Sequence, residues 1–162
     1  MFRSMRRIRQ QLAHEEAEAI LRRTTSGVLA LLGDDDYPYA VPLSHVYHNG
    51  KLYFHGAMDG HKADAVRRHA KASFCVIAAD DVVPHRFTTR YRSVIAFGRV
   101  REVKDANEKR EAITALAMRY GAAHMARGRE EIAQEWDHVC MLALDIEHMT
   151  GKESKELTDE RP

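Results

Sequence analysis

The chain has 162 residues, of which 44% are hydrophobic and 30% charged, a composition typical of one soluble globular domain. Its 25 Lys and Arg residues nearly balance its 24 Asp and Glu residues, which gives no basis for nonspecific binding to nucleic acid or membranes through net charge. No apolar run is long enough to cross a bilayer and the basic start is not followed by an apolar stretch, so we expect a cytoplasmic protein.

Hydrophobic periodicity predicts about six strands, mostly joined by short turns, and three or four peripheral helices. This pattern favours a mainly β fold, an antiparallel barrel with helices packed outside, in a single domain over 1–152. In chain order we expect a loose segment at 1–12, a helix at 13–23 with Ala17, Ile20 and Leu21 on one side, strands at 26–32, 39–48 and 51–56, a helix entered at 59–69, a strand at 71–79, a loop at 80–89, a strand at 91–103, helices at 107–120 and 130–135, a strand at 137–148, and a loose, charged C-terminal tail at 153–162.

The clearest local signal is Asn49-Gly50, which supplies the two positive φ angles that a type I′ hairpin requires. A two-residue loop also sets the register, placing His48 opposite Lys51 and Ser44 opposite His55. The hydroxyl of Ser44 and the imidazole of His55 then lie side by side on the outer face of the hairpin. The hairpin alone leaves open whether this face is simply solvated or binds a ligand.

A second signal lies where the chain leaves this hairpin and enters a helix. His61 and Lys62 occupy its first turn, which Asp59 could cap, although helix N-termini usually prefer acidic side chains. Basic residues there are locally unfavourable unless an anion is bound, and phosphate suits the free backbone N–H groups of a helix start. Gly56 and Gly60 would let the backbone approach such a ligand closely. The alternative is an ordinary exposed lysine.

Other site patterns are absent from the sequence. There is no glycine-rich dinucleotide motif, no phosphate loop and no nucleophile elbow, and the ten histidines have no metal-binding spacing, so we expect no metal. Cys75 and Cys140 sit in apolar runs, which favours free buried thiols over a disulfide between them. The helix at 107–120 is interpreted as a packing element and not as part of a site.

Several segments, taken in their order and spacing, resemble the pyridoxamine 5′-phosphate oxidase-like superfamily, and more narrowly its nitroimidazole-resistance branch. The resemblance covers about 13–152, nearly the whole chain. The segments are YPYAVPLS at 37–44, NGKLYFHGA at 49–57, GHK at 60–62, FTTRYRSVIAFG at 87–98 and EHMTGK at 147–152.

The resemblance implies a six-stranded split β-barrel that forms a homodimer, with flavin mononucleotide (FMN) at the subunit interface. It implies that the isoalloxazine ring is lined by Val41, Pro42, Leu43 and Ser44, and that His55, Gly56 and Ala57 lie beside the ring or the ribityl chain. His61 and Lys62 would hold the phosphate. Residues completing the cleft, some of them from the partner subunit, would be Thr89, Tyr91, Ser93, Met149, Thr150, Gly151 and Lys152.

The expected function is therefore a flavin-dependent oxidoreductase that reduces a small aromatic, nitroimidazole-like acceptor, with His55 as the catalytic group because imidazole exchanges protons near neutral pH. A non-catalytic protein that binds flavin or haem, and a deazaflavin in place of FMN, stay open. A pyridoxamine 5′-phosphate oxidase-type oxidation is disfavoured, because the residues near Pro162 lack the further basic groups expected for a substrate phosphate.

Overall fold

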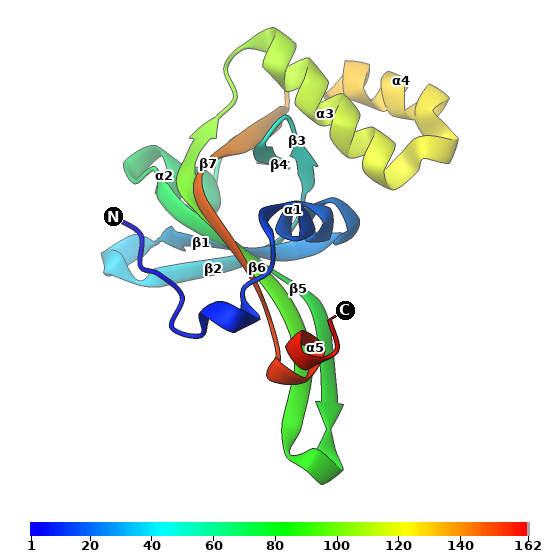
Figure 1. The fold of residues 1–162 in the computed structure, drawn as a ribbon. Helices are drawn as coiled ribbons and strands as arrows, with labels where there is room; N and C mark the ends of the chain where they lie inside the picture. The colour runs from blue at the N-terminus through cyan, green and yellow to red at the C-terminus, as the bar shows by residue number, and fades with distance from the viewer. Residues whose placement is uncertain (162) are drawn as a thin grey trace.

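The computed structural model describes residues 1–161 and shows one curled, antiparallel sheet with helices around it (Figure 1). The predicted mainly β, antiparallel architecture is confirmed. The strands, in chain order, are β1 Ser26–Leu32, β2 Pro38–Ser44, β3 Val46–His48, β4 Lys51–Ala57, β5 Lys71–Val83, β6 Thr88–Glu102 and β7 Val139–Glu153. The helices are α1 His14–Arg23, α2 His61–Arg68, α3 Ala106–Gly121, α4 Met125–Glu135 and α5 Lys155–Asp159.

The described sheet has seven strands rather than the six predicted, in the order β2-β1-β5-β6-β7-β4-β3. The segment expected as one strand at 39–48 is two strands, because the chain breaks at His45, whose side chain is completely buried in the core. β2 pairs with β1 and β3 pairs with β4, so the two halves lie at opposite edges. Since only His45 separates them, the sheet must curl until its edges approach each other.

The predicted hairpin turn is confirmed. Asn49 and Gly50 have φ angles of 49° and 74°. His48 pairs with Lys51 and Tyr47 with Leu52, as the two-residue loop requires. The expected pairing of Ser44 with His55 is wrong, because the strand break at His45 removes Ser44 from this hairpin.

The hairpin formed by β5 and β6 is longer than predicted and projects beyond the rest of the sheet (Figure 1). The segment expected as a loop at 80–89 instead extends β5 to Val83 and starts β6 at Thr88, leaving a tight turn over Pro84–Arg86. Likewise β7 continues to Glu153. Strand pairing outweighs the polar composition here, because β6 forms backbone hydrogen bonds with β5 and β7 on its two sides.

Two clusters of buried side chains hold the helices against the sheet. The larger fills the inside of the curl, where α1 contributes the predicted Ala17, Ile20 and Leu21, each 1% exposed. The smaller lies on the outer face of β4 and β7, where Tyr53 packs against Leu116 of α3. This second cluster fixes α3, and α4 beside it, over one end of the sheet (Figure 1).

The two terminal segments, expected to be loose, are docked on the sheet. Gln11 forms a bridge with Lys152 of β7. The tail forms α5, anchored by the fully buried Glu153, whose carboxylate accepts hydrogen bonds from Arg92 at 2.8 Å and Arg161 at 2.5 Å. These ion pairs hold the tail in place, although its charged composition alone predicts a solvated, loose segment. Within residues 1–161, no helix has the length and apolar character needed to traverse a membrane.

Candidate functional site

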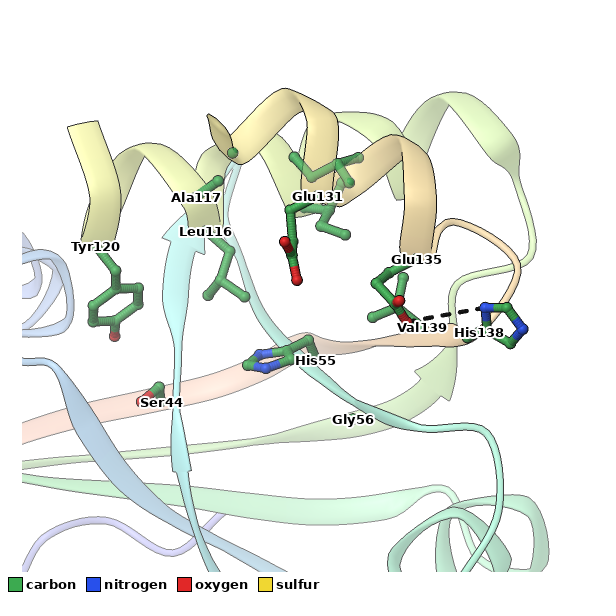
Figure 2. A pocket seen from close by; sticks show the side chains of 13 residues that line it. Ser44, His55, Gly56, Leu116, Ala117, Tyr120, Glu131, Glu135, His138 and Val139 are labelled. Atoms are coloured by element: carbon green, nitrogen blue, oxygen red, sulfur yellow. Dashed lines mark ion pairs between the residues drawn. The ribbon is translucent and has the colours of Figure 1, made fainter. Parts of the chain in front are cut away.

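A pocket of about 570 Å³ lies between the strands and the α3–α4 pair. Figure 2 shows Ser44 and His55 on its strand side, with side chains of the two helices opposite. Its walls are mainly apolar, as is usual for sites that take planar organic ligands. The lining residues are Ser44, His55, Gly56, Ile113, Leu116, Ala117, Tyr120, Gly128, Glu131, Ile132, Glu135, His138 and Val139.

The strand break at His45 is what brings Ser44 and His55 to one pocket. The buried His45 ring donates from Nε2 to the carbonyl of Leu21 at 2.9 Å, with its edge on Phe74, and burial lowers its pKa. Ser44 therefore ends β2 at one sheet edge while His55 lies in β4 near the other. The predicted convergence of hydroxyl and imidazole is retained, although they are not cross-strand partners.

Tyr120 closes the end of the pocket at this break. Its hydroxyl accepts a hydrogen bond from the amide of His45 at 3.2 Å and lies 2.7 Å from the same residue's carbonyl oxygen, to which it can donate. The hydroxyl also contacts the carbonyl of Thr25. Tyr120 belongs to the last turn of α3. These hydrogen bonds therefore connect the helical wall of the pocket, its roof, to the break between β2 and β3 at His45.

Lys62 does not itself line the pocket, but its side chain lies against Gly56, which does. A Cβ built on Gly56 would sit 2.6 Å from the Lys62 Nζ, so the ammonium occupies the space that a side chain at position 56 would fill. The ammonium is partly buried and has no carboxylate within ion-pair distance among residues 1–161. The N-terminus of α2 beside it has no side-chain cap. The N-cap residue is Gly60, at φ 96°, and the expected cap by Asp59 is not formed.

His61 points elsewhere. Its ring stacks on Tyr39 with 4.0 Å between ring centroids, and its Nε2 lies 3.8 Å from a carboxylate oxygen of Asp34. Of the two basic residues predicted to hold a phosphate, Lys62 therefore lies beside a residue that lines the pocket, Gly56, whereas His61 contacts Tyr39 and Asp34.

The other predicted residues on this side belong to the strand ends. Val41 and Leu43 pack partly against the core, whereas Pro42 is exposed on the outer face of β2. Ala57 ends β4 and pairs with Val139 of the pocket wall. Of these residues, only Val139 lines the pocket.

The remaining predicted residues form a separate group along β6 and β7. Ser93 pairs with Lys152, whose Nζ lies 5.6 Å from the centre of the Tyr91 ring, and Thr150 pairs with Ile95. Thr89 and Tyr91 line a groove at the tip of the long hairpin. Met149 packs against the core, and Gly151 is buried under Leu12. One chain does not bring this group to the pocket, and its completion by a partner subunit stays a prediction.

The helical roof is the part of the pocket that sequence reasoning missed. The helix predicted at 107–120 is confirmed as α3, and it packs through Ala112, Ile113 and Leu116. Its packing role is confirmed, and its residues Leu116 and Tyr120 also line the pocket, which the sequence interpretation did not include. The sequence of α4 carries no local signal of a site, since its pocket residues Glu131 and Glu135 are exposed glutamates of the kind found on any helix surface.

Charge in the pocket is uneven. Glu135 lies 3.9 Å from a ring nitrogen of His138, whereas Glu131 has no basic group within ion-pair distance in the described part of the chain.

Cys75 and Cys140 are free, and burial raises the pKa of both thiols. No cluster of three or more His, Cys, Asp or Glu side chains within 1–161 has a geometry suited to a metal ion.

Solved structures share this fold over most of the chain. A Bacteroides thetaiotaomicron protein assigned to 5-nitroimidazole antibiotic resistance superposes with a TM-score of 0.73 at 21% identity, covering 88% of this chain and 86% of its own. The flavocytochrome Anf3 of Azotobacter vinelandii has a TM-score of 0.80 at 20% sequence identity, over 94% of this chain and 72% of its own. The FAD and heme binding protein of Mycobacterium smegmatis has a TM-score of 0.78 at 25% sequence identity, over 90% of this chain and 74% of its own.

These likenesses identify the fold as a split barrel. No curated protein sequence matches the chain. A family model described as pyridoxamine 5′-phosphate oxidase matches residues 13–153, nearly the whole chain. The protein therefore belongs to the pyridoxamine 5′-phosphate oxidase family.

Proposed function

We propose that the protein is a flavoprotein that binds FMN in this pocket and reduces a small aromatic, nitroimidazole-like acceptor. The observation that carries the proposal is the unpaired ammonium of Lys62, held against Gly56 at the start of α2. Family membership supports a flavin, as do the flavin-binding proteins among the similar structures.

The residues present fit the cofactor. A phosphate monoester carries close to two negative charges at neutral pH. Lys62 can donate to it, together with the free N–H groups of the first turn of α2. The mostly apolar walls suit a planar ring, and Ser44 and His55 provide polar groups at its edge.

The chain's own residues then have distinct tasks. When bound, the flavin supplies the reversible transfer of electrons from NADH or NADPH to the acceptor. Lys62 anchors the phosphate, and the α3–α4 roof keeps water from the ring. His55 holds a ring nitrogen at the pocket, where it can donate or accept the proton that accompanies electron transfer.

We also propose a homodimer whose shared cleft completes the site. The support is an apolar outer face formed by adjacent strands: Val28 pairs with Cys75 and Cys75 with Ile95, while Val28 and Ile95 are 39% and 38% exposed. Ile77, 66% exposed, extends this face along β5. Such contiguous apolar surface is typical of a protein interface. A partner placed there could bring Thr89, Tyr91, Ser93 and Lys152 to the other subunit's pocket.

The test is to purify the protein, denature it, and identify the released chromophore, adding FMN during purification where occupancy is low. We expect FMN, reduction of its absorbance by NADH or NADPH, and reoxidation by nitroaromatic acceptors. A chromophore that neither donor reduces at any pH tried would argue against the reductase, and failure to bind FMN would argue against the cofactor site.

A second candidate is a protein that binds FAD or haem without catalysing this reaction. It is favoured by the likeness to a flavocytochrome and to an FAD and heme binding protein. The same spectrum separates the cases, because haem gives an intense Soret band and flavins fluoresce after release.

A further inference from the structure

His45 places an ionisable ring inside the apolar core, at the break between β2 and β3. The side chain is fully buried, and its ring lies 5.0 Å from the ring of Phe74, which packs in turn against Phe54. A phenylalanine would fill this site without bringing a polar atom that needs a partner. Because the imidazole brings two nitrogens, the protonation state of His45 decides whether the core tolerates its ring.

Only one of the two ring nitrogens has a partner. Nε2 lies 2.9 Å from the carbonyl oxygen of Leu21 in α1, and because a carbonyl can only accept, this nitrogen carries the hydrogen. Nδ1 then holds the lone pair of a neutral imidazole, and it has no hydrogen-bond partner among residues 1–161. A second proton would sit on Nδ1 as a buried charge and as a donor without an acceptor.

The charged groups on the surrounding elements do not offset such a proton. Burial, chiefly, and the positive charge of Arg119 on α3 lower the pKa of His45. On α1, the carboxylate of Glu18 accepts a hydrogen bond from Tyr47 instead. β5 presents the uncharged ring of Phe74. In the described part of the chain, no carboxylate lies within ion-pair distance of His45, so a protonated ring has no compensating partner.

The backbone of His45 also joins the strand side of the pocket to its roof. Its amide donates to the hydroxyl of Tyr120 at 3.2 Å, and its carbonyl lies 2.7 Å from the same hydroxyl. The residue before it is Ser44, and Figure 2 shows Ser44 and Tyr120 at the same end of the pocket. Movement of the ring out of the core would therefore disturb β2, α3 and this end of the pocket together.

We propose that His45 is a pH-sensitive switch: its neutral ring keeps the break between β2 and β3 closed, and protonation moves the ring out of the core and releases Ser44 and Tyr120. This regulation goes beyond the flavin function proposed above and does not depend on which ligand the pocket binds.

The direction of the switch follows from proton linkage. An exposed histidine takes up a proton near its ordinary pKa of 6.5, whereas the buried ring resists it. The closed form therefore keeps its full advantage above about pH 6.5 and loses it as the pH falls below that value. If the closed form binds no proton, the equilibrium constant for opening rises by about ten-fold between pH 7.5 and pH 5.5.

The test is hydrogen exchange of the His45 backbone amide, measured by NMR at pH 7.5 and pH 5.5 without ligand. This amide is bonded to Tyr120, so it exchanges when the break opens. Its protection, corrected for the intrinsic exchange rate, should fall by about ten-fold at the lower pH. At both pH values it should stay well below the protection of Val94, in the centre of the sheet, which marks global unfolding.

Two variants assign the effect to the ring. His45→Phe keeps an aromatic ring in the core, and His45→Gln keeps a donor for the Leu21 carbonyl, but neither titrates. Both should remove the pH dependence of protection at position 45, whereas His124→Gln, at an exposed position, should retain it. FMN affinity should fall with acid more steeply in the unaltered protein than in His45→Phe. Failure to bind FMN would count against the proposed function alone, since exchange is measured without ligand.

Each contrary result overturns the switch. Equal protection of the His45 amide at both pH values would contradict it, as would a pH dependence that persists in both variants. Protection equal to that of Val94 would show global unfolding instead of a local opening. A last measurement needs no variant: the ring nitrogen shifts of His45 should show a neutral ring in the closed form at both pH values. A protonated ring with undiminished protection of the amide would also overturn the switch.

Discussion

Gly56 is a position where a missing side chain makes room for a charged one. Because a Cβ there would lie 2.6 Å from the Lys62 Nζ, Gly56→Ala must displace the ammonium. The displaced atom ends a flexible side chain, so stability should change by less than about 1 kcal/mol. We expect FMN binding, measured by fluorescence quenching, to weaken by about ten-fold.

The control for this substitution is Gly121→Ala at the end of α3, where a new Cβ would meet no atom within 4 Å. It should bind FMN like the unaltered protein. Unchanged FMN affinity in Gly56→Ala would show that FMN binding does not depend on the position of the Lys62 ammonium beside residue 56.

His55 gives a prediction about chemistry. His55→Gln keeps a polar side chain of similar length but cannot take up a proton near neutral pH. If the imidazole exchanges the proton of the reaction, turnover of a nitroaromatic acceptor should fall by about 100-fold with little change in FMN affinity. The exposed His124 supplies the control, His124→Gln. Equal turnover of the His55 variant would remove its catalytic assignment.

At the residue scale, the structure brings together some of the predicted site residues, although their binding role stays a prediction. Lys62 lies beside Gly56, as a helix start that adjoins a strand end allows. Ser44 and His55 share the pocket as expected. The α4 wall was missed because α4 and β4, about 75 positions apart in the chain, line one pocket only in the folded structure, which no local pattern encodes.

At the scale of elements, α3 is pinned to the sheet by Glu108. Its carboxylate accepts hydrogen bonds from Arg101 at 2.8 and 3.0 Å, from Tyr53 at 3.0 Å and from Lys51 at 3.2 Å. The Arg101 guanidinium, chiefly, lowers the pKa of Glu108 to about 2. These bonds hold the helix whose later turns form the roof of the pocket.

This network predicts a pH dependence of stability. A carboxyl whose pKa is depressed by folding stabilises the native state above its unfolded pKa near 4.5 and loses that contribution as pH falls toward 2. Glu108→Gln should therefore lower the free energy of unfolding by about 2 kcal/mol at pH 7 and by less at pH 3. Urea denaturation at the two pH values measures both quantities.

Glu111→Gln provides the control, since Glu111 is exposed on the same helix. It should leave stability unchanged at both pH values. A Glu108→Gln penalty that is equal at pH 7 and pH 3 would contradict the assigned role.

Elements were predictable where periodicity or turn chemistry was strong. The helix at 107–120 and the Asn49-Gly50 turn are local features, and the structure has both. The break at His45 was not predictable, because the alternation of side chains runs through this inward-facing residue without a glycine, proline or other signal that the strand stops there. The extension of β5 to Val83 was not predictable, because Asp80 and Asp81 are typical of loops. In the structure they pair with β6 at an exposed part of the strand, where acidic side chains are tolerated.

At the scale of the whole molecule, the apolar outer face predicts self-association. Ile95→Lys places a charge in the middle of that face and should shift the protein from dimer to monomer in sedimentation analysis. Met118→Lys, at an exposed apolar position on α3, is the control and should stay dimeric. An unaltered protein that is already monomeric at micromolar concentration would contradict the dimer.

The most direct measurement of the central claim compares FMN with riboflavin, which lacks the phosphate, in the unaltered protein, Lys62→Ala and the exposed-lysine control Lys104→Ala. Loss of a charge-assisted phosphate contact should weaken FMN binding by about ten- to a hundred-fold in Lys62→Ala only, leaving riboflavin affinity unchanged in all three proteins. Equal effects of Lys62→Ala on both ligands, or none on either, would contradict a phosphate site at the start of α2.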